Sequence, residues 1–256
     1  MEPLAKSRFL CARNDKHKRM RKIERTHEVA DWWTQDMPSF AQLDRRGRLP
    51  LHGQGRKMAL ILASASPRRR ELLRAAGIAF EVQATDIPEV PEPGEAPHAF
   101  AGRMALHKAK TIASWRVDEW VLGADTIVVV DGTILGKPRD EEDAARMLRV
   151  LSGRQHDVIT AVCICKLSSG IMGSDCLSET TRVTFSELSE EDIAFYVSTG
   201  EPMDKAGAYG IQGIASRWIS RIAGDYSNVV GLPVALVWSM LRGRGVVEHR
   251  GLKPLF

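Results

Sequence analysis

Apolar runs alternate with helical patterns along most of this 256-residue chain. Four apolar residues at 60–63 predict a short buried strand, and 121–130 (VLGADTIVVV) gives the strongest strand signal, interrupted at Gly123-Ala124-Asp125-Thr126. Further strands are expected at 78–82, 133–135, 158–166 and 180–185, and helices from Pro67 to a C-cap at Gly77 and over 98–114, 140–151 and 189–198. This alternation predicts an α/β fold, and the Asp131-Gly132 turn signal favours a mixed sheet over a purely parallel one.

The first predicted helix begins with two arginines. Ser66 is a preferred N-cap residue and Pro67 is tolerated at a first helical position, so Arg68 and Arg69 project from the first turn. Free backbone N–H groups and the helix dipole already suit an anion there, and two added positive charges are unfavourable unless an anion neutralises them. Because guanidinium groups match phosphate oxygens in bidentate fashion, the pattern favours a polyphosphate site. The alternative is a solvated basic turn.

Asp125 is the most informative acid, because its neighbours in the strand are apolar, glycine or threonine. A carboxylate removed from water must be paired, bound to a metal or raised in pKa, and each state suits a general base or a metal ligand. The alternative is an aspartate that caps its own turn. Lys137 lies between Gly136 and Pro138, and a hairpin at 133–135 would return it to the strand that carries Asp125. The alternative for Lys137 is a surface lysine in a turn.

Other polar residues carry weaker signals. Glu89 is one of several acids in a proline-rich loop, Lys108 lies on a predicted helix, and Gln212 either reads a base edge or satisfies a turn. His156 is interpreted as a structural hydrogen-bonding residue. The chain contains no Walker A pattern, no GxSxG elbow and no HExxH pair. The residue chemistry alone therefore indicates an α/β domain suited to metal-assisted handling of a phosphorylated ligand.

Charge is unevenly distributed along the chain. Residues 1–57 carry 14 lysines and arginines against 7 acids, a net charge of +7, whereas 58–256 carry 22 against 25, a net charge of −3. An acidic body is a poor candidate for nonspecific nucleic-acid binding, so no nucleic-acid partner is expected. The basic leader is expected to be a disordered tail, with Met58 as the natural start and a mitochondrial transit peptide as the rival interpretation. The globular domain is expected over 58–244, and a C-terminal tail over 245–256.

Hydropathy and cysteine spacing bear on membrane association and on the cellular compartment. No apolar run approaches 18 residues, and the first residues lack the apolar core of a secretory signal, so no membrane partner is expected. Neither a CxxC pair nor zinc spacing occurs among the four cysteines, which are Cys11, Cys163, Cys165 and Cys176. Reduced thiols and a cytoplasmic location are therefore expected.

Six short motifs occur in order along the expected domain. They are SASPRR at 64–69, GADT at 123–126, GKP at 136–138, SG followed by His156 at 152–156, EPMDKAG at 201–207, and GLP at 231–233. Each is weak alone, but together they closely resemble the Maf family of nucleoside triphosphate pyrophosphatases. The resemblance covers essentially 58–244 and omits the leader. It implies a fold similar to the inosine-triphosphatase-like proteins, with an elongated mixed sheet flanked by helices and a central cleft between two lobes.

The resemblance also implies a reaction and its residues. The reaction would be hydrolysis of a nucleoside triphosphate to the monophosphate and pyrophosphate with a divalent metal, Mg²⁺ or Mn²⁺. Asp125 would be the proton acceptor that activates water, with Glu89 beside it near the metal. Lys108 and Lys137 would complete the catalytic set at the phosphates. The substrate-binding residues would be Ser64, Arg68, Arg69, Thr126 and Gln212.

Within that family, Arg68, Thr126 and the DKAGAYGIQG segment through Gln212 resemble the branch that hydrolyses dTTP and UTP. The branch acting on 7-methyl-GTP differs in that segment. Modified uridine or cytidine nucleotides are further expected substrates, which would make the role house-cleaning of the nucleotide pool. The alternative is a non-catalytic nucleotide-binding regulator of septum formation. The family resemblance also suggests a homodimer.

Overall fold

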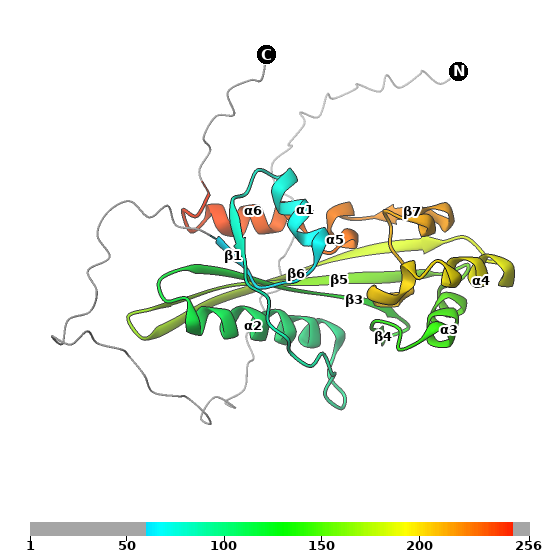
Figure 1. Cartoon of the computed structure of the whole chain (residues 1–256), viewed down its shortest axis with the longest axis horizontal. Coiled ribbons are helices and arrows are strands. Elements are labelled where there is room, and N and C mark those ends of the chain that lie inside the picture. The colour runs from blue at the N-terminus through cyan, green and yellow to red at the C-terminus, as the bar shows by residue number, and fades with distance from the viewer. Residues whose placement is uncertain (1–59, 248–256) are drawn as a thin grey trace, which may run out of the picture. The chain divides into compact units, whose positions relative to one another are not determined.

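The computed structural model describes residues 60–247, which form one mixed sheet flanked by helices (Figure 1). The predicted leader 1–57 lies outside the described residues, as does most of the predicted tail. The expected α/β fold with a mixed sheet is confirmed. Its strands are β1 (Leu60–Leu62), β2 (Phe80–Val82), β3 (Trp120–Val130), β4 (Thr133–Leu135), β5 (Gln155–Ser168), β6 (Ile171–Phe185) and β7 (Ile219–Ala223). Its α-helices are α1 (Pro67–Ala75), α2 (Pro97–Trp115), α3 (Glu141–Leu151), α4 (Glu190–Ser198), α5 (Tyr226–Val230) and α6 (Val234–Arg242), and its 3₁₀ helices are η1 (Glu201–Asp204), η2 (Ala206–Ala208) and η3 (Ile214–Trp218).

The strand order is β2-β1-β3-β5-β6-β7, with β4 paired to the end of β3. β1 runs parallel to β2 and β3, whereas the other pairs are antiparallel. The turn between β3 and β4 forms as expected, because Asp131 and Gly132 both adopt positive φ, at 49° and 76°. Two consecutive residues of positive φ make the tight hairpin connection whose twist matches antiparallel strands. Lys137, just beyond β4, is thereby returned toward β3.

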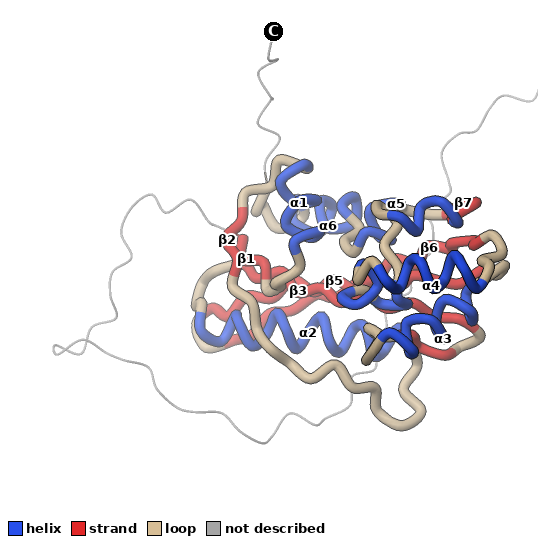
Figure 2. Tube along the Cα trace, turned by 45° about the vertical axis from the view of Figure 1, so that its right-hand side comes forward, coloured by secondary structure: helices blue, strands red, loops and turns tan. Residues whose placement is uncertain are grey.

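Helices cover both faces of the sheet (Figures 1 and 2). The alternation of side chains in β1 divides its residues between the two layers. Ile61 packs with the buried face of α2 on one side, and Leu60 and Leu62 pack with α1 and α6 on the other. A third hydrophobic cluster surrounds Leu148 of α3 and Tyr196 of α4, near the end of the sheet where β4 lies (Figure 1). The molecule therefore has two lobes. One contains the hydrophobic cluster beneath α1 and α6, and the other contains the cluster of α3 and α4.

Three strand assignments differ from the sequence prediction. β3 is continuous through the expected interruption, because Gly123 to Thr126 keep their ladder partners on β5. β6 begins at Ile171, nine residues before the predicted 180–185 strand, because a turn at Ser169 and Gly170 pairs a polar, exposed segment with β5. β7 was not predicted, since its five residues form an edge strand with no clear alternation.

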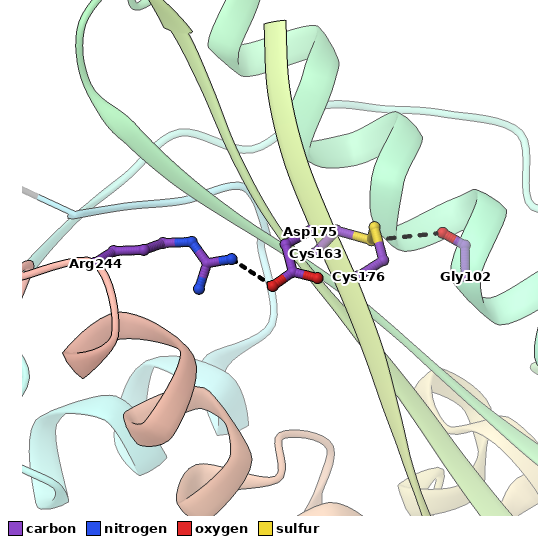
Figure 3. Close-up of a disulfide and its surroundings, with 5 residues drawn as sticks. All are labelled: Gly102, Cys163, Asp175, Cys176 and Arg244. Atoms are coloured by element: carbon purple, nitrogen blue, oxygen red, sulfur yellow. Dashed lines mark hydrogen bonds and ion pairs between the residues drawn. A yellow bond between two sulfur atoms is a disulfide. The ribbon is translucent and has the colours of Figure 1, made fainter. Parts of the chain in front are cut away.

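The expectation of four reduced thiols is wrong for two cysteines. Cys163 of β5 and Cys176 of β6 are directly opposite each other in the antiparallel ladder and form a disulfide, with Cα atoms 4.1 Å apart (Figure 3). Their 13-residue separation concealed the pairing, because the register of the hairpin cannot be read from cysteine spacing. Cys165 is free and buried, and burial raises the pKa of its thiol to about 12. No helix among residues 60–247 is long and apolar enough to cross a membrane.

The disulfide predicts a redox-dependent stability. Closing a loop of this length restricts the unfolded chain, so reduction should lower the free energy of unfolding by about 3 kcal/mol. Urea unfolding of the chain with and without a thiol reductant measures the difference. Cys176→Ser should unfold like the reduced chain under both conditions. Equal unfolding midpoints for the oxidised and reduced wild-type chain would contradict the prediction.

Candidate functional site

A cavity of about 950 Å³ opens between the two lobes. The β1–α1 connection lines one side, and the segments that follow β4 and α4 line the other. The residues predicted from the sequence all line this cavity, and they are Ser64, Arg68, Arg69, Glu89, Lys108, Asp125, Thr126, Lys137 and Gln212. Residues spread over 149 positions are thus brought to one place.

An alternating row of charges forms the floor of the cavity. The Nζ atom of Lys108 lies 2.7 Å from Oδ1 of Asp125 and 2.6 Å from Oε1 of Glu89. The side chains of Lys108 and Asp125 are only 9% and 6% exposed. Asp125 lies within β3 and not at a turn, so the self-capping alternative is wrong. Of the states expected for a desolvated carboxylate, the structure therefore shows the paired one.

Lys108 reaches Asp125 because α2 lies directly against β3. A Cβ atom added to Gly123 would fall 2.2 Å from the carbonyl oxygen of Ala105 and 2.8 Å from the amide nitrogen of Ala109. Real Cβ atoms do not approach that closely, so only glycine permits this contact. Ala105 and Ala109 flank Lys108 on α2, and Gly123 precedes Asp125 by two residues. The close packing thus sets the length of the Lys108–Asp125 ion pair.

Lys137 and Glu89 lie at the more exposed side of this row. The Nζ atom of Lys137 is 3.9 Å from Oε2 of Glu89, and the Lys137 side chain is 60% exposed. Burial raises the pKa of the Glu89 carboxyl, but the hydrogen bond from Lys108 and the charges of Lys108, Lys137 and Arg69 outweigh burial and hold that pKa below its usual value. The hairpin returns Lys137 toward Asp125 as predicted, but its nearest acid is Glu89, which is linked to Asp125 through Lys108.

The two arginines of α1 have different surroundings. Arg69 is buried, and its Nε, Nη1 and Nη2 atoms donate to the carbonyl oxygen of Gly231, to Ser64 Oγ and to Thr126 Oγ1 at 2.9, 3.0 and 3.0 Å. Burial lowers the pKa of its guanidinium, against the raising effect of Asp125 and Glu89. Arg68 is more exposed and donates to Asp204 Oδ2 at 3.0 Å. Arg69 therefore links α1 to Thr126 and Gly231 within one lobe, whereas Arg68 extends across the cavity.

Thr126 belongs to a buried polar chain behind Arg69. Its Oγ1 atom lies 3.0 Å from Oγ1 of Thr160, which donates to the carbonyl oxygen of Asn228 at 3.2 Å. The side-chain Nδ2 atom of Asn228 donates in turn to the carbonyl oxygen of Val158. These bonds hold the α5 segment against β5, and with it the Gly231 carbonyl that receives Arg69.

Gln212 and His156 also have defined positions. Gln212 is exposed at the cavity, on the short segment between η2 and η3. His156 is buried, with Nε2 2.7 Å from the hydroxyl oxygen of Tyr209, and burial lowers the pKa of its imidazole to about 4. The structural interpretation of His156 agrees with this placement.

The acidic residues of the cavity suit one kind of metal. Within residues 60–247, no group of three or more histidine, cysteine or acidic side chains is arranged to hold a metal ion. Glu89 and Asp125, however, share Lys108 as a neighbour and both line the cavity. Mg²⁺ is commonly held by one or two carboxylates together with substrate phosphates, and not by a complete protein cage. The donor set therefore fits Mg²⁺, or the similar Mn²⁺, in the presence of a polyphosphate.

Comparison with known proteins identifies the family of this chain. A family model described as Maf-like protein matches residues 59–244. The chain belongs to the Maf-like protein family. The matched segment includes every residue of the cavity floor and every motif on which the sequence resemblance rests.

Three proteins similar to this Maf-like chain share one name. A protein of Koribacter versatilis named dTTP/UTP pyrophosphatase is 56% identical and aligns over 74% of this chain and 96% of its own length. Proteins of the same name from Geobacter metallireducens and Geobacter sulfurreducens are 53% and 52% identical, over 73% and 75% of this chain and 97% and 99% of their own. The solved Ham1 protein of Staphylococcus aureus aligns over 73% of this chain and 99% of its own length at 14% identity, with a TM-score of 0.40.

The Maf-like chain also contains a residue outside the cavity that fixes a cavity-lining loop and that the sequence did not reveal. Arg103 of α2 donates to the carbonyl oxygen of Val90 at 3.0 Å and to both carboxylate oxygens of Glu95 at 2.7 and 2.6 Å. These bonds attach the proline-rich loop to α2 on the C-terminal side of Glu89. No local signal distinguished Arg103, because its partners become neighbours only when the loop folds back.

The contact between α2 and β3 predicts the effect of a single methyl group. Gly123→Ala should lower the free energy of unfolding by about 1–3 kcal/mol, because the methyl group meets backbone atoms that cannot rotate away. It should also lower any activity of the site, because the added methyl group pushes α2 away from β3 and so separates Lys108 from Asp125. Urea unfolding measures the first effect.

Gly102→Ala is the matched control for Gly123→Ala. A Cβ atom at Gly102, also on α2, meets nothing within 4 Å, so this variant should be as stable as the wild type or slightly more stable. Equal stability of the two alanine variants would contradict the assigned contact.

Proposed function

We propose that this chain hydrolyses dTTP and UTP to the monophosphate and pyrophosphate. The observation that carries the proposal is the buried Asp125–Lys108 pair at the floor of a cavity that also contains exposed cations. A carboxylate whose second oxygen faces the cavity can serve as a base, and a triphosphate requires several positive groups nearby. The name that relatives above 50% identity share supports the choice of substrate.

The proposed reaction is attack of water on the α-phosphorus. A bond forms between the water oxygen and the α-phosphorus, the bond to the bridging oxygen breaks, and pyrophosphate leaves. Asp125 accepts the proton of the water on Oδ2, because Oδ1 already receives the hydrogen bond from Lys108. Arg68 and Lys137, the more exposed cations of the cavity, bind the phosphate oxygens.

Glu89 and Asp125 are the residues that we propose hold a divalent metal. When bound, Mg²⁺ or Mn²⁺ supplies neutralisation of phosphate charge and polarisation of phosphate oxygens. Lys108 holds the two carboxylates near each other before any ligand arrives. Arg103 fixes the loop that carries Glu89, so it acts on the site only through that residue.

Gln212 is the residue that we propose reads the base. Its amide offers one acceptor and two donors, which can match the oxygen and imide N–H at the edge of uracil or thymine. Modified pyrimidine nucleotides with the same edge are accepted on the same basis, which makes the role house-cleaning of the nucleotide pool. A cytoplasmic location and a homodimeric assembly are part of the same proposal. The activity is assigned to residues 58–244.

The non-catalytic septum-formation regulator receives no support from these observations. A regulator that has lost turnover should lack the base or a phosphate ligand. Asp125, Lys137, Arg68 and Arg69 are all present and line one cavity.

A nucleotide panel tests the proposed function. Pyrophosphate release by the full chain should be readily measured with dTTP and UTP in the presence of Mg²⁺ or Mn²⁺, and should be small with GTP and 7-methyl-GTP. Asp125→Asn should lower turnover about 10²–10⁴-fold, the typical contribution of a general base, while nucleotide binding persists.

Asp131→Asn is the control substitution for this panel. Asp131 lies at the exposed turn after β3, and asparagine tolerates its positive φ, so turnover should be unchanged. Binding without hydrolysis by the wild-type chain would favour the regulator, and normal turnover by Asp125→Asn would exclude Asp125 as the base.

A further inference from the structure

The segment that carries Gln212 is held at both of its ends. The amide N–H of Gly210 donates to the hydroxyl oxygen of Tyr196 at 3.1 Å. Four residues later, the amide N–H of Ile214 donates to Oε2 of Glu201 at 3.2 Å. Gln212 lies midway between these two bonds, with its side chain exposed at the cavity. The backbone on each side of Gln212 is therefore fixed by a side chain from outside the segment.

The two holding side chains are bonded to each other. The hydroxyl of Tyr196 donates to Oε1 of Glu201 at 3.0 Å while its oxygen accepts from Gly210. Burial raises the pKa of the Tyr196 hydroxyl, so it keeps its proton and acts as a donor. Tyr196 itself is fully buried on α4 and packs edge-on against Trp218, with ring centroids 5.5 Å apart. The pair is thus anchored in the hydrophobic cluster of its lobe.

Two glycines allow the segment to lie directly on this support. A Cβ atom at Gly213 would fall 2.0 Å from Oε1 of Glu201, and one at Gly210 would fall 2.7 Å from Cε of Lys205. The Nζ atom of Lys205 donates to the backbone carbonyl of Glu201 at 2.5 Å and fixes that residue in turn. The glycines therefore fit the segment against Glu201 and Lys205 with no space for movement toward them.

We propose that Tyr196 and Glu201 form a clamp that positions Gln212 and so sets the selectivity among nucleotide bases. Tyr196 does not line the cavity, so it is a positioning residue that acts through the Gly210–Ile214 backbone. A fixed backbone restricts the positions that the Gln212 amide can reach, so the amide cannot shift to pair with the wrong base edge, and polar groups that the bound base covers are then left unpaired. A mobile amide can adapt to both edges. This inference rests on the proposed function, in which Gln212 reads the base.

Tyr196→Phe is the most direct variant, because it removes both hydroxyl bonds and leaves the buried ring in place. The ratio of kcat/KM for UTP to that for CTP should fall about tenfold, mainly through a higher KM for UTP. Amide exchange at Gly210 and Ile214 should become faster. Glu201→Gln retains an acceptor for the segment and should give an intermediate change in the ratio. Urea unfolding verifies that both variants remain folded.

Tyr226→Phe is the matched control, since Tyr226 is half-exposed on α5 and does not line the cavity. Its UTP-to-CTP ratio should equal that of the wild type. An equal fractional loss with every nucleotide in Tyr196→Phe would indicate a merely structural role and overturn the clamp, as would an unchanged ratio.

Calorimetric binding of UTP and CTP separates this inference from the proposed function. If the wild-type chain binds nucleotides but does not hydrolyse them, the proposed function fails, and the affinity ratio in Tyr196→Phe still decides the clamp. If the wild-type chain neither binds nor hydrolyses any nucleotide, both are overturned. A wild-type enzyme with unchanged selectivity in the variant overturns the clamp alone.

Discussion

The ion pair between Lys108 and Asp125 is the constraint on which the rest of this site depends. A carboxylate buried in the middle of a strand loses its hydration, and a hydrogen-bonded cation offsets that loss. Lys108 provides the cation, but only because α2 lies on β3 at backbone contact distance over Gly123. The same lysine also donates a hydrogen bond to Glu89, so the position of α2 places both carboxylates.

Two further ion pairs of the cavity involve its more exposed cations. Arg68 of one lobe meets Asp204 of the other, and Lys137 lies near Glu89. Exposed pairs of this kind contribute little to stability, about 0–1 kcal/mol, so a polyphosphate can replace them at small cost. The buried bonds of Arg69, in contrast, join α1 to Gly231 and Thr126 and keep the lobe intact while the exposed cations change partners.

Local signals predicted the parts of the site that depend on local geometry. The Ser66 cap, whose Oγ accepts from the Arg69 amide, was predicted from residue type alone, as was the hairpin that returns Lys137. The continuity of β3, the Cys163–Cys176 pairing and the Arg103 anchor were not predicted. Each depends on a register or a packing contact between segments distant in sequence. Asp125, Lys137 and the arginine pair of α1 were singled out from their own residue chemistry. Glu89 and Lys108 carried weak signals alone and were added through the resemblance of six ordered motifs to a family, and all of these residues line one cavity.

The position of the attacked phosphorus tests the central claim most directly. Hydrolysis of dTTP by the full chain in water enriched in ¹⁸O, followed by mass spectrometry of both products, locates the new oxygen. Attack at the α-phosphorus by water that Asp125 activates predicts one ¹⁸O atom in the monophosphate and none in the pyrophosphate. Label in the pyrophosphate, with an unlabelled monophosphate, would show attack at the β-phosphorus and contradict the assigned reaction.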